Sequence, residues 1–200
     1  APARDTLYRN EGDGTFTDVS EPAGIAGAPG TGLGLVAGDF DGDGRVDMFV
    51  ANDAMKDRLW INLGNGRFED RALIAGVATD ARGHMTASMG VIARDVDFDG
   101  DLDLMVCNVA QESDSLFRND GGFFVEVSNV AGIASVSRPF TRFGQAWHDF
   151  DHDGLLDLYQ ANGRVMRQER TFDEADPYAE PNLVFRGTPR GRFEEVRPRG

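Results

Sequence analysis

The sequence predicts an all-β protein, a β-propeller of four-stranded antiparallel blades. Two repeated patterns carry this prediction. An acidic loop occurs three times, with starts 56 and 54 residues apart at Asp39, Asp95 and Asp149, and a glycine-rich hairpin pattern occurs four times around these loops. This spacing is typical of propeller blades and is too long for one coil of a β-helix. The 25 glycines and 10% aromatic residues suit short strands joined by tight turns.

The hairpin pattern places alternating apolar residues on both sides of a turn rich in Gly, Asn and Asp. These residue types supply the positive φ angles that hairpin turns need. The four copies are LYRNEGDGTFTDV from Leu7, LWINLGNGRFEDR from Leu59, LFRNDGGFFVEV from Leu116 and LVFRGTPRGRFEEV from Leu183. A short AGIA or AGVA connection follows each of the first three copies.

Each acidic loop has the form D-x-D-x-D-G-x-x-D and precedes an apolar, strand-like segment. Side chains at positions 1, 3, 5 and 9 can converge on one cation, a carbonyl at position 7 can add an oxygen, and glycine at position 6 permits the sharp turn. An all-oxygen ligand set in a flexible loop favours Ca²⁺ over Mg²⁺. An EF-hand would need Glu at position 12, where Val50, Val106 and Gln160 stand.

We therefore predict three Ca²⁺ sites, each formed by one loop. Their ligands are Asp39, Asp41, Asp43, Asp47 and the backbone carbonyl of Arg45; Asp95, Asp97, Asp99, Asp103 and the backbone carbonyl of Asp101; and Asp149, Asp151, Asp153, Asp157 and the backbone carbonyl of Leu155.

In chain order, one repeat reads as strand, acidic loop, strand, connection, strand, tight turn and strand. The predicted blades are residues 31–87, 88–142 and 143–200, and residues 1–30 form the outer hairpin of an incomplete blade. About three and a half blades do not close a ring, because propellers hold four to eight. We expect either a segment of a longer chain or a half-ring that a homo-oligomer completes.

Composition limits the classes of partner. The formal net charge of -14 argues against nucleic acid, which needs a basic surface, and no polybasic or long apolar segment predicts membrane insertion. Twelve of the 34 acidic residues occupy positions 1, 3, 5 and 9 of the loops, so the acidity is largely ligand chemistry. Cys107, the single cysteine, is expected to be a small buried residue. Weak calcium loops suit an extracellular, cell-surface or periplasmic setting.

Antiparallel connectivity places the acidic loops and hairpin turns at one face and the variable connections at the other. We expect a protein or glycan ligand on this second face, since loops on rigid scaffolds commonly carry function. Its longest connection, residues 162–182, is either a recognition loop or lid, or a solvated insertion. His84, with two methionines nearby, could join a soft-metal site, although ordinary packing or exposure explains it more simply.

The chain resembles the FG-GAP/VCBS repeats of integrin α-like β-propellers. The three acidic loops carry this resemblance, together with Gly34, Gly90 and the Phe143-Gly144 pair upstream of them. The hairpins and the DGLLDLYQANG segment are similar to proteins of the ASPIC/UnbV and cartilage-acidic-protein type. The resemblance implies calcium in the loops and partner binding on the opposite face, and it implies little about activity.

The favoured hypothesis is a calcium-binding propeller scaffold or interaction module. The alternatives are a propeller enzyme that acts on carbohydrate, with lyase-like chemistry, and a calcium-dependent lectin. The sequence shows no G-x-S-x-G element, no Cys/His nucleophile pair and no phosphate-binding glycine loop, so the enzyme alternative has no candidate catalytic residues.

Overall fold

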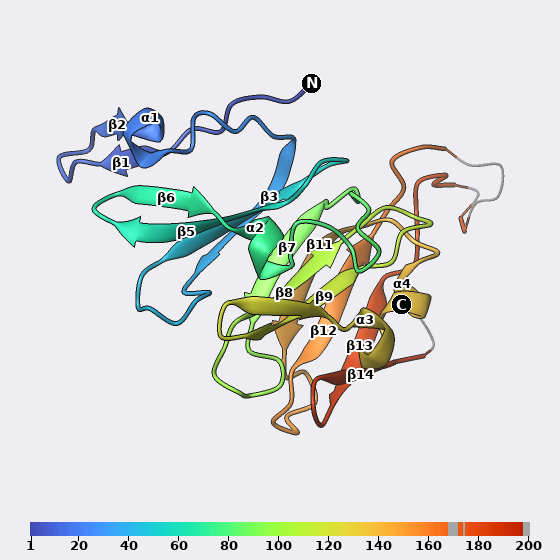
Figure 1. The fold of residues 1–200 in the computed structure, drawn as a ribbon. Helices are drawn as coiled ribbons and strands as arrows, with labels where there is room; N and C mark the ends of the chain where they lie inside the picture. Colours follow the sequence, from blue (N-terminus) through green and yellow to red (C-terminus); the bar gives the residue numbers. More distant parts are fainter. Residues whose placement is uncertain (168–171, 174, 198–200) are drawn as a thin grey trace.

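A computed structural model of the chain describes residues 1–167, 172–173 and 175–197. Its strands form one two-stranded and three four-stranded sheets, all antiparallel, and the sheets do not close into a ring (Figure 1). The predicted all-β fold with four-stranded antiparallel blades is therefore confirmed.

The sheets follow one another along the chain. The two-stranded sheet consists of β1 (Tyr8–Asn10) and β2 (Phe16–Asp18). The first complete blade consists of β3 (Gly32–Gly38), β4 (Asp47–Asn52), β5 (Arg58–Gly64) and β6 (Arg67–Asp70). The second consists of β7 (Gly90–Arg94), β8 (Asp103–Cys107), β9 (Ser115–Asp120) and β10 (Phe123–Glu126). The third consists of β11 (Arg142–His148), β12 (Asp157–Asn162), β13 (Leu183–Thr188) and β14 (Arg192–Glu195).

One-turn helices follow the outer strand of several sheets, a feature that the strand-based prediction did not include. They are α1 (Ser20–Ala23), α2 (Ala72–Ala75), α3 (Ser128–Ala131) and α4 (Ala134–Ser137). Each AGIA-type connection ends such a helix with a glycine at positive φ, which L side chains rarely adopt. At Gly132, a Cβ would also lie 2.5 Å from the carbonyl oxygen of Phe193 in the next blade. The connection therefore docks each blade against its neighbour.

The inner strands β3, β7 and β11 lie side by side, and small residues let their backbones approach (Figure 1). A Cβ on Gly34 would lie 3.3 Å from the Cα of Gly90, and a Cβ on Gly90 would lie 2.2 Å from the carbonyl oxygen of Phe143. Gly34 and Gly90, which precede the first two acidic loops, thus have a packing role.

Apolar clusters between adjacent blades form the core. Phe117 of β9 packs with Phe40 and Phe49 of the preceding blade, and Phe185 of β13 packs with Met105 and Leu116. Cys107 is fully buried, as expected, and burial raises its pKa to about 12. At each junction between complete blades, a phenylalanine from the third strand of the later blade, Phe117 or Phe185, therefore packs into the core of the earlier blade.

The first complete blade keeps one face only partly covered. Trp60 of β5, which stands where β9 has Phe117, packs with Ile25 beside the two-stranded sheet. On β3, Leu33 and Leu35 are 56% and 62% exposed. The strands β1 and β2 correspond to the outer pair of a blade, so the inner pair that would cover these leucines is absent from residues 1–30. Completion of the ring by a homo-oligomer stays a prediction.

Replacing Gly90 by Ala should lower the free energy of unfolding by about 1–3 kcal/mol, because the added Cβ overpacks the contact with β11. Denaturant unfolding at fixed calcium measures this change. Gly27→Ala is the matched control, since a Cβ at Gly27 meets no atom within 4 Å. Equal stability of the two variants would contradict the close approach of β7 and β11.

Candidate functional site

The three acidic loops connect the first and second strands of each complete blade and lie along the lower edge of Figure 1. Asp at position 1 closes each loop by accepting hydrogen bonds from two backbone amides. In the first loop, Asp39 accepts from Asp43 N at 3.1 Å and from Gly44 N at 2.8 Å. Asp95 and Asp149 make the equivalent bonds in the other two loops. The local sequence therefore folds into a preformed turn with carboxylates on its inner side.

Asp at position 9 is buried in each loop, at the start of the second strand. In the second loop, Asp103 accepts hydrogen bonds from Val96 N at 2.9 Å and from Asn119 N at 2.8 Å. Asp47 and Asp157 bond their own loop and the third strand of their blade in the same way. Position 9 thus joins the acidic loop to the outer hairpin, a role that the sequence pattern alone did not predict.

The structure gathers three predicted ligands in each loop, with one ligand atom per residue and all such atoms within 4.8 Å of one another. The sets are Asp39, Asp41 and Asp43; Asp95, Asp97 and Asp99; and Asp149, Asp151 and Asp157. The predicted ligands Asp47, Asp103 and Asp153 lie outside these sets. The carbonyls of Arg45, Asp101 and Leu155 stay predicted ligands.

Position 3 provides the clearest test of whether a cation fits. Oδ1 of Asp41 and Oδ1 of Asp97 are buried, and neither has a hydrogen-bond partner among the described residues. A buried carboxylate oxygen without a partner is costly unless a donor or a cation reaches it. These two loops therefore have the ligand chemistry of a cation site.

Electrostatics points to the same conclusion. Burial, together with Asp99 and Asp95 nearby, raises the pKa of Asp97. Burial also raises the pKa of Asp47, and it raises the pKa of Asp103 to about 6. A divalent cation would offset this repulsion and favour the ionised carboxylates.

The three loops differ in how arginine approaches them. In the third loop, the Nε of Arg186 donates a hydrogen bond to Oδ2 of Asp151 at 2.7 Å, so position 3 is already paired. In the first loop, Arg45 pairs with Asp43 instead and donates to the carbonyl of Asn62 at 2.6 Å. A cation in the third loop would have to compete with a guanidinium for Asp151.

The sequence profile of the FG-GAP-like repeat family matches residues 1–50, 39–106 and 95–159, well over half of the chain. The chain belongs to the FG-GAP-like repeat family. The resemblance that the acidic loops and inner glycines indicated is therefore confirmed.

This FG-GAP-like chain is also similar to cartilage acidic protein 1. It is 33% identical to the Xenopus tropicalis protein over 172 residues, which cover 81% of this chain and 25% of that protein. It is 31% identical to the Mus musculus and Homo sapiens proteins over 191 residues, 90% of this chain and 26% of each relative. The chain thus spans about a quarter of the length of these relatives.

Among solved structures, the chain aligns with an Agrocybe aegerita lectin described by its specific recognition of non-reducing terminal N-acetylglucosamine. The TM-score is 0.47 and the sequence identity is 18%, with 98% of this chain and 46% of that chain covered.

At the face opposite the acidic loops, a buried aspartate closes the connection between the second and third strands. Asp57 accepts from Asn52 N at 2.7 Å, and Asp114 accepts from Asn108 N at 2.9 Å. The start of the next blade, at or just before its first strand, supplies a second partner. It is Ser88 for Asp57, at 3.1 Å, and it is Arg142 for Asp114, in a fully buried ion pair. These aspartates therefore join neighbouring blades, and no motif signalled them.

A polar pocket of about 440 Å³ lies beside Asp114. We call it the connection pocket, because its walls are three connections: residues 80–86, residues 111–115 and the segment that contains α3 and α4. His84 lies exposed at this pocket, with its Nδ1 3.5 Å from Asp80. The predicted soft-metal role of His84 stays a prediction.

The 162–182 connection is fixed at both ends. Arg164 and Glu180 form a buried ion pair at 3.1 Å, and Glu180 also accepts from Thr141 N at 2.7 Å. Residues 168–171 and 174 of this connection lie outside the described residues, so the choice between a recognition loop and a solvated insertion stays open.

Replacing Arg186 by Gln should strengthen calcium binding in the third loop about fivefold, because it frees Asp151 and removes a nearby positive charge. Calcium titration followed by the amide signals of this loop measures the change. Arg9→Gln, which removes an exposed arginine paired with Glu11 far from the loops, should leave the affinity unaltered. An unchanged third-loop affinity in R186Q would show that Arg186 does not compete with the ion.

Asp57 should make stability depend on pH, because burial raises its folded-state pKa to about 7, whereas the unfolded value is about 3.9. The folded state then binds more protons than the unfolded state between these values. The contribution of Asp57 to stability is fully present below about pH 4 and is lost as pH rises through about 7.

Asp57→Asn removes this titration and keeps a similar shape. The free energy of unfolding of the natural protein should therefore fall relative to that of D57N between pH 4 and pH 7, by at most about 1.4 kcal/mol per pH unit. Asp53→Asn changes an exposed neighbouring residue, so the free energy of unfolding of this variant should vary with pH in parallel with that of the natural protein. Parallel curves for D57N and the natural protein would contradict a raised pKa.

Proposed function

We propose that this chain is a calcium-stabilised propeller scaffold whose three acidic loops each bind Ca²⁺ and whose opposite face binds a partner. The observation that carries the proposal is the unpartnered buried oxygen at position 3 of the first two loops. Oxygen ligands from a short flexible loop are the chemistry that Ca²⁺ prefers.

Calcium would stabilise the fold through position 9. Each buried position-9 aspartate bonds both the loop and the third strand, so a metal that orders the loop also holds the outer hairpin. Because an ordered loop is required for binding, the binding free energy contributes to folding stability. The proposed role of the ion is structural, and no catalytic step is assigned to it.

The partner site is proposed at the face of the connections. Its walls differ from blade to blade, whereas the acidic loops repeat with little change. The connection pocket is a polar cavity of about 440 Å³ that the connections form there. A rigid scaffold with varied loops on one face is a common way to build a binding surface.

We also propose an extracellular, cell-surface or periplasmic setting. Calcium loops of this type suit calcium-rich compartments, and the relatives include cartilage acidic protein 1. Within the described residues, no helix has the length and apolar character needed to cross a membrane.

Asp97→Asn tests the calcium sites, because it removes one charge and keeps the side-chain shape. We expect the number of bound ions to fall from three to two. The calcium-dependent gain in the free energy of unfolding should fall by about 2.7 kcal/mol at a free calcium concentration one hundred times the dissociation constant. Equilibrium dialysis with metal analysis, combined with thermal unfolding, measures both quantities.

The matched control is Asp120→Asn, which removes one exposed charge from the same blade outside the loop. D120N should keep three ions and the full calcium response. If D97N also kept both, Asp97 would not be a ligand and the calcium assignment of the second loop would be wrong.

A further inference from the structure

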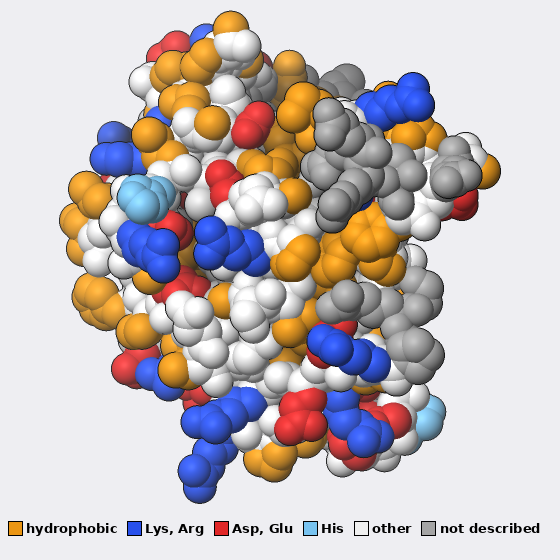
Figure 2. Space-filling view, turned by 90° about the vertical axis from the view of Figure 1, so that its right-hand side faces the viewer, with side chains coloured by type: hydrophobic (Ala, Val, Ile, Leu, Met, Phe, Trp, Pro, Cys, Tyr) orange, Lys and Arg blue, Asp and Glu red, His pale blue; other side chains and the backbone are white. Residues whose placement is uncertain are grey.

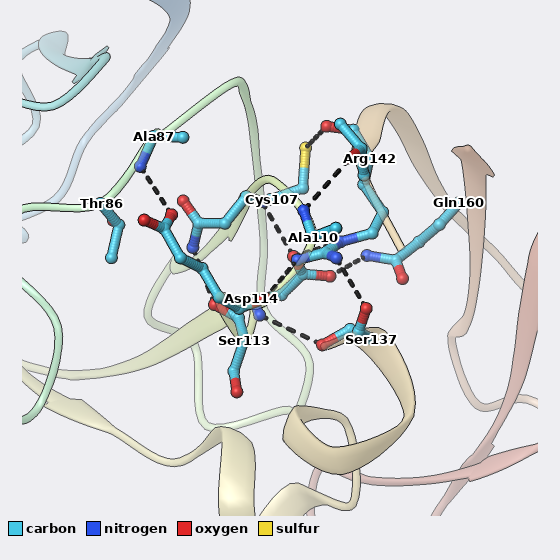
Figure 3. Close-up of polar contacts among 12 residues, drawn as sticks. Thr86, Ala87, Cys107, Ala110, Ser113, Asp114, Ser137, Arg142 and Gln160 are labelled. Carbon is cyan, nitrogen blue, oxygen red and sulfur yellow. Dashed lines mark hydrogen bonds and ion pairs between the residues drawn. The ribbon is translucent and has the colours of Figure 1, made fainter. Parts of the chain in front are cut away.

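The connection pocket is rigid, because one buried network fixes two of its walls (Figure 3). Asp114 is 1% exposed and pairs with Arg142, while Gln160 donates to its other oxygen at 2.7 Å. Arg142 also donates to the carbonyl of Ser137 in the α4 wall at 2.6 Å and to the carbonyl of Glu112 at 3.0 Å. A single guanidinium thus holds the 111–115 wall and the α4 wall in place.

Further hydrogen bonds tie the walls to one another. Glu112 accepts from Ala87 N at 2.9 Å, which joins the 111–115 connection to the end of the 80–86 connection. Gln111 N donates to the carbonyl of Arg138 at 2.8 Å, which joins the same connection to the end of α4. The pocket is therefore preorganised, and a ligand would not have to order its walls.

The acidic side chains of the pocket already accept hydrogen bonds from the protein, whereas two of its basic side chains do not pair with any described residue. Asp80 accepts from the backbone amides of Arg82 and His84, and Glu126 accepts from Ser128 N at 3.0 Å. By contrast, the side chains of Arg82 and Arg138 have no hydrogen bond or ion pair with any part of the chain that the structure describes. Figure 2 shows one side of the molecule on which basic side chains lie close to acidic ones.

The remaining lining groups are those that recognise hydroxyls. Thr86, Ser113 and Ser135 offer hydroxyl groups, and Asn129 offers an amide. A multiply charged anion such as phosphate would be repelled by the three lining carboxylates that pair with no described arginine, Asp80, Glu112 and Glu126. A ligand with one carboxylate and several hydroxyls matches the two free guanidinium groups and the hydroxyl-binding walls together.

We propose that the connection pocket binds a saccharide residue that carries a carboxylate, as a uronic acid does. The carboxylate pairs with Arg82 and Arg138, and the sugar hydroxyls bond the hydroxyl, amide and carboxylate groups of the walls. The volume of about 440 Å³ lies within the range of small-molecule sites. The inference rests on the proposed function in that it assigns a ligand class to the partner face of the calcium-stabilised scaffold.

The test titrates the full chain, in saturating calcium, with methyl β-glucuronide and with methyl β-glucoside, and follows backbone amide signals by NMR. The glucuronide should shift amides of residues 80–86, 111–115 and 134–138 and should bind at least tenfold more tightly than the glucoside. Equal affinities, shifts elsewhere or no binding of the glucuronide would overturn the proposal.

The variants Arg82→Gln and Arg138→Gln should each weaken glucuronide binding about tenfold. Arg67→Gln is the matched control, since Arg67 is exposed beside the β5–β6 turn, at the other end of the blade. Binding that R82Q and R138Q leave unchanged would also overturn the proposal. Calcium stoichiometry measured on the same samples separates the two hypotheses: three bound ions without glucuronide binding would reject the pocket and retain the scaffold.

Discussion

The buried carboxylate at position 9 of each acidic loop is the interaction on which the rest of the blade depends. Asp103 receives one backbone hydrogen bond from its own loop and one from the third strand, so it connects the inner and outer halves of the sheet. The same carboxylate lies close to other aspartates, and its pKa rises to about 6 through burial. The geometry that holds the blade together therefore also concentrates negative charge, which a cation would offset.

Much of this arrangement could be predicted from the sequence, because the chain repeats it. The three D-x-D-x-D-G-x-x-D loops, the hairpin turns and the order of the strands follow from residue spacing and turn chemistry alone. The sequence also shows the repeated glycines at Gly34, Gly90 and Gly144, but it does not show why glycine is needed there. Only the structure shows that Gly90 has no room for a Cβ against the backbone of β11.

The features that could not be predicted come from side chains that differ between repeats. Ser88 and Arg142 occupy equivalent positions, each two residues before an inner-strand glycine. Ser88 gives Asp57 only a hydroxyl hydrogen bond, whereas Arg142 neutralises the charge of Asp114. Likewise, among the described residues, the aspartate at position 3 forms an ion pair with an arginine only in the third loop, where Arg186 pairs with Asp151. Such contacts join residues far apart in sequence, and they make each blade junction and each loop chemically distinct within a repeated frame.

The most direct test of the account is a calcium titration of the natural chain by native mass spectrometry, with stepwise addition of Ca²⁺ to metal-free protein. The account predicts three bound ions at saturation, with the last ion bound most weakly because Arg186 competes for Asp151. Saturation at fewer than three ions would contradict the claim that every acidic loop is a calcium site.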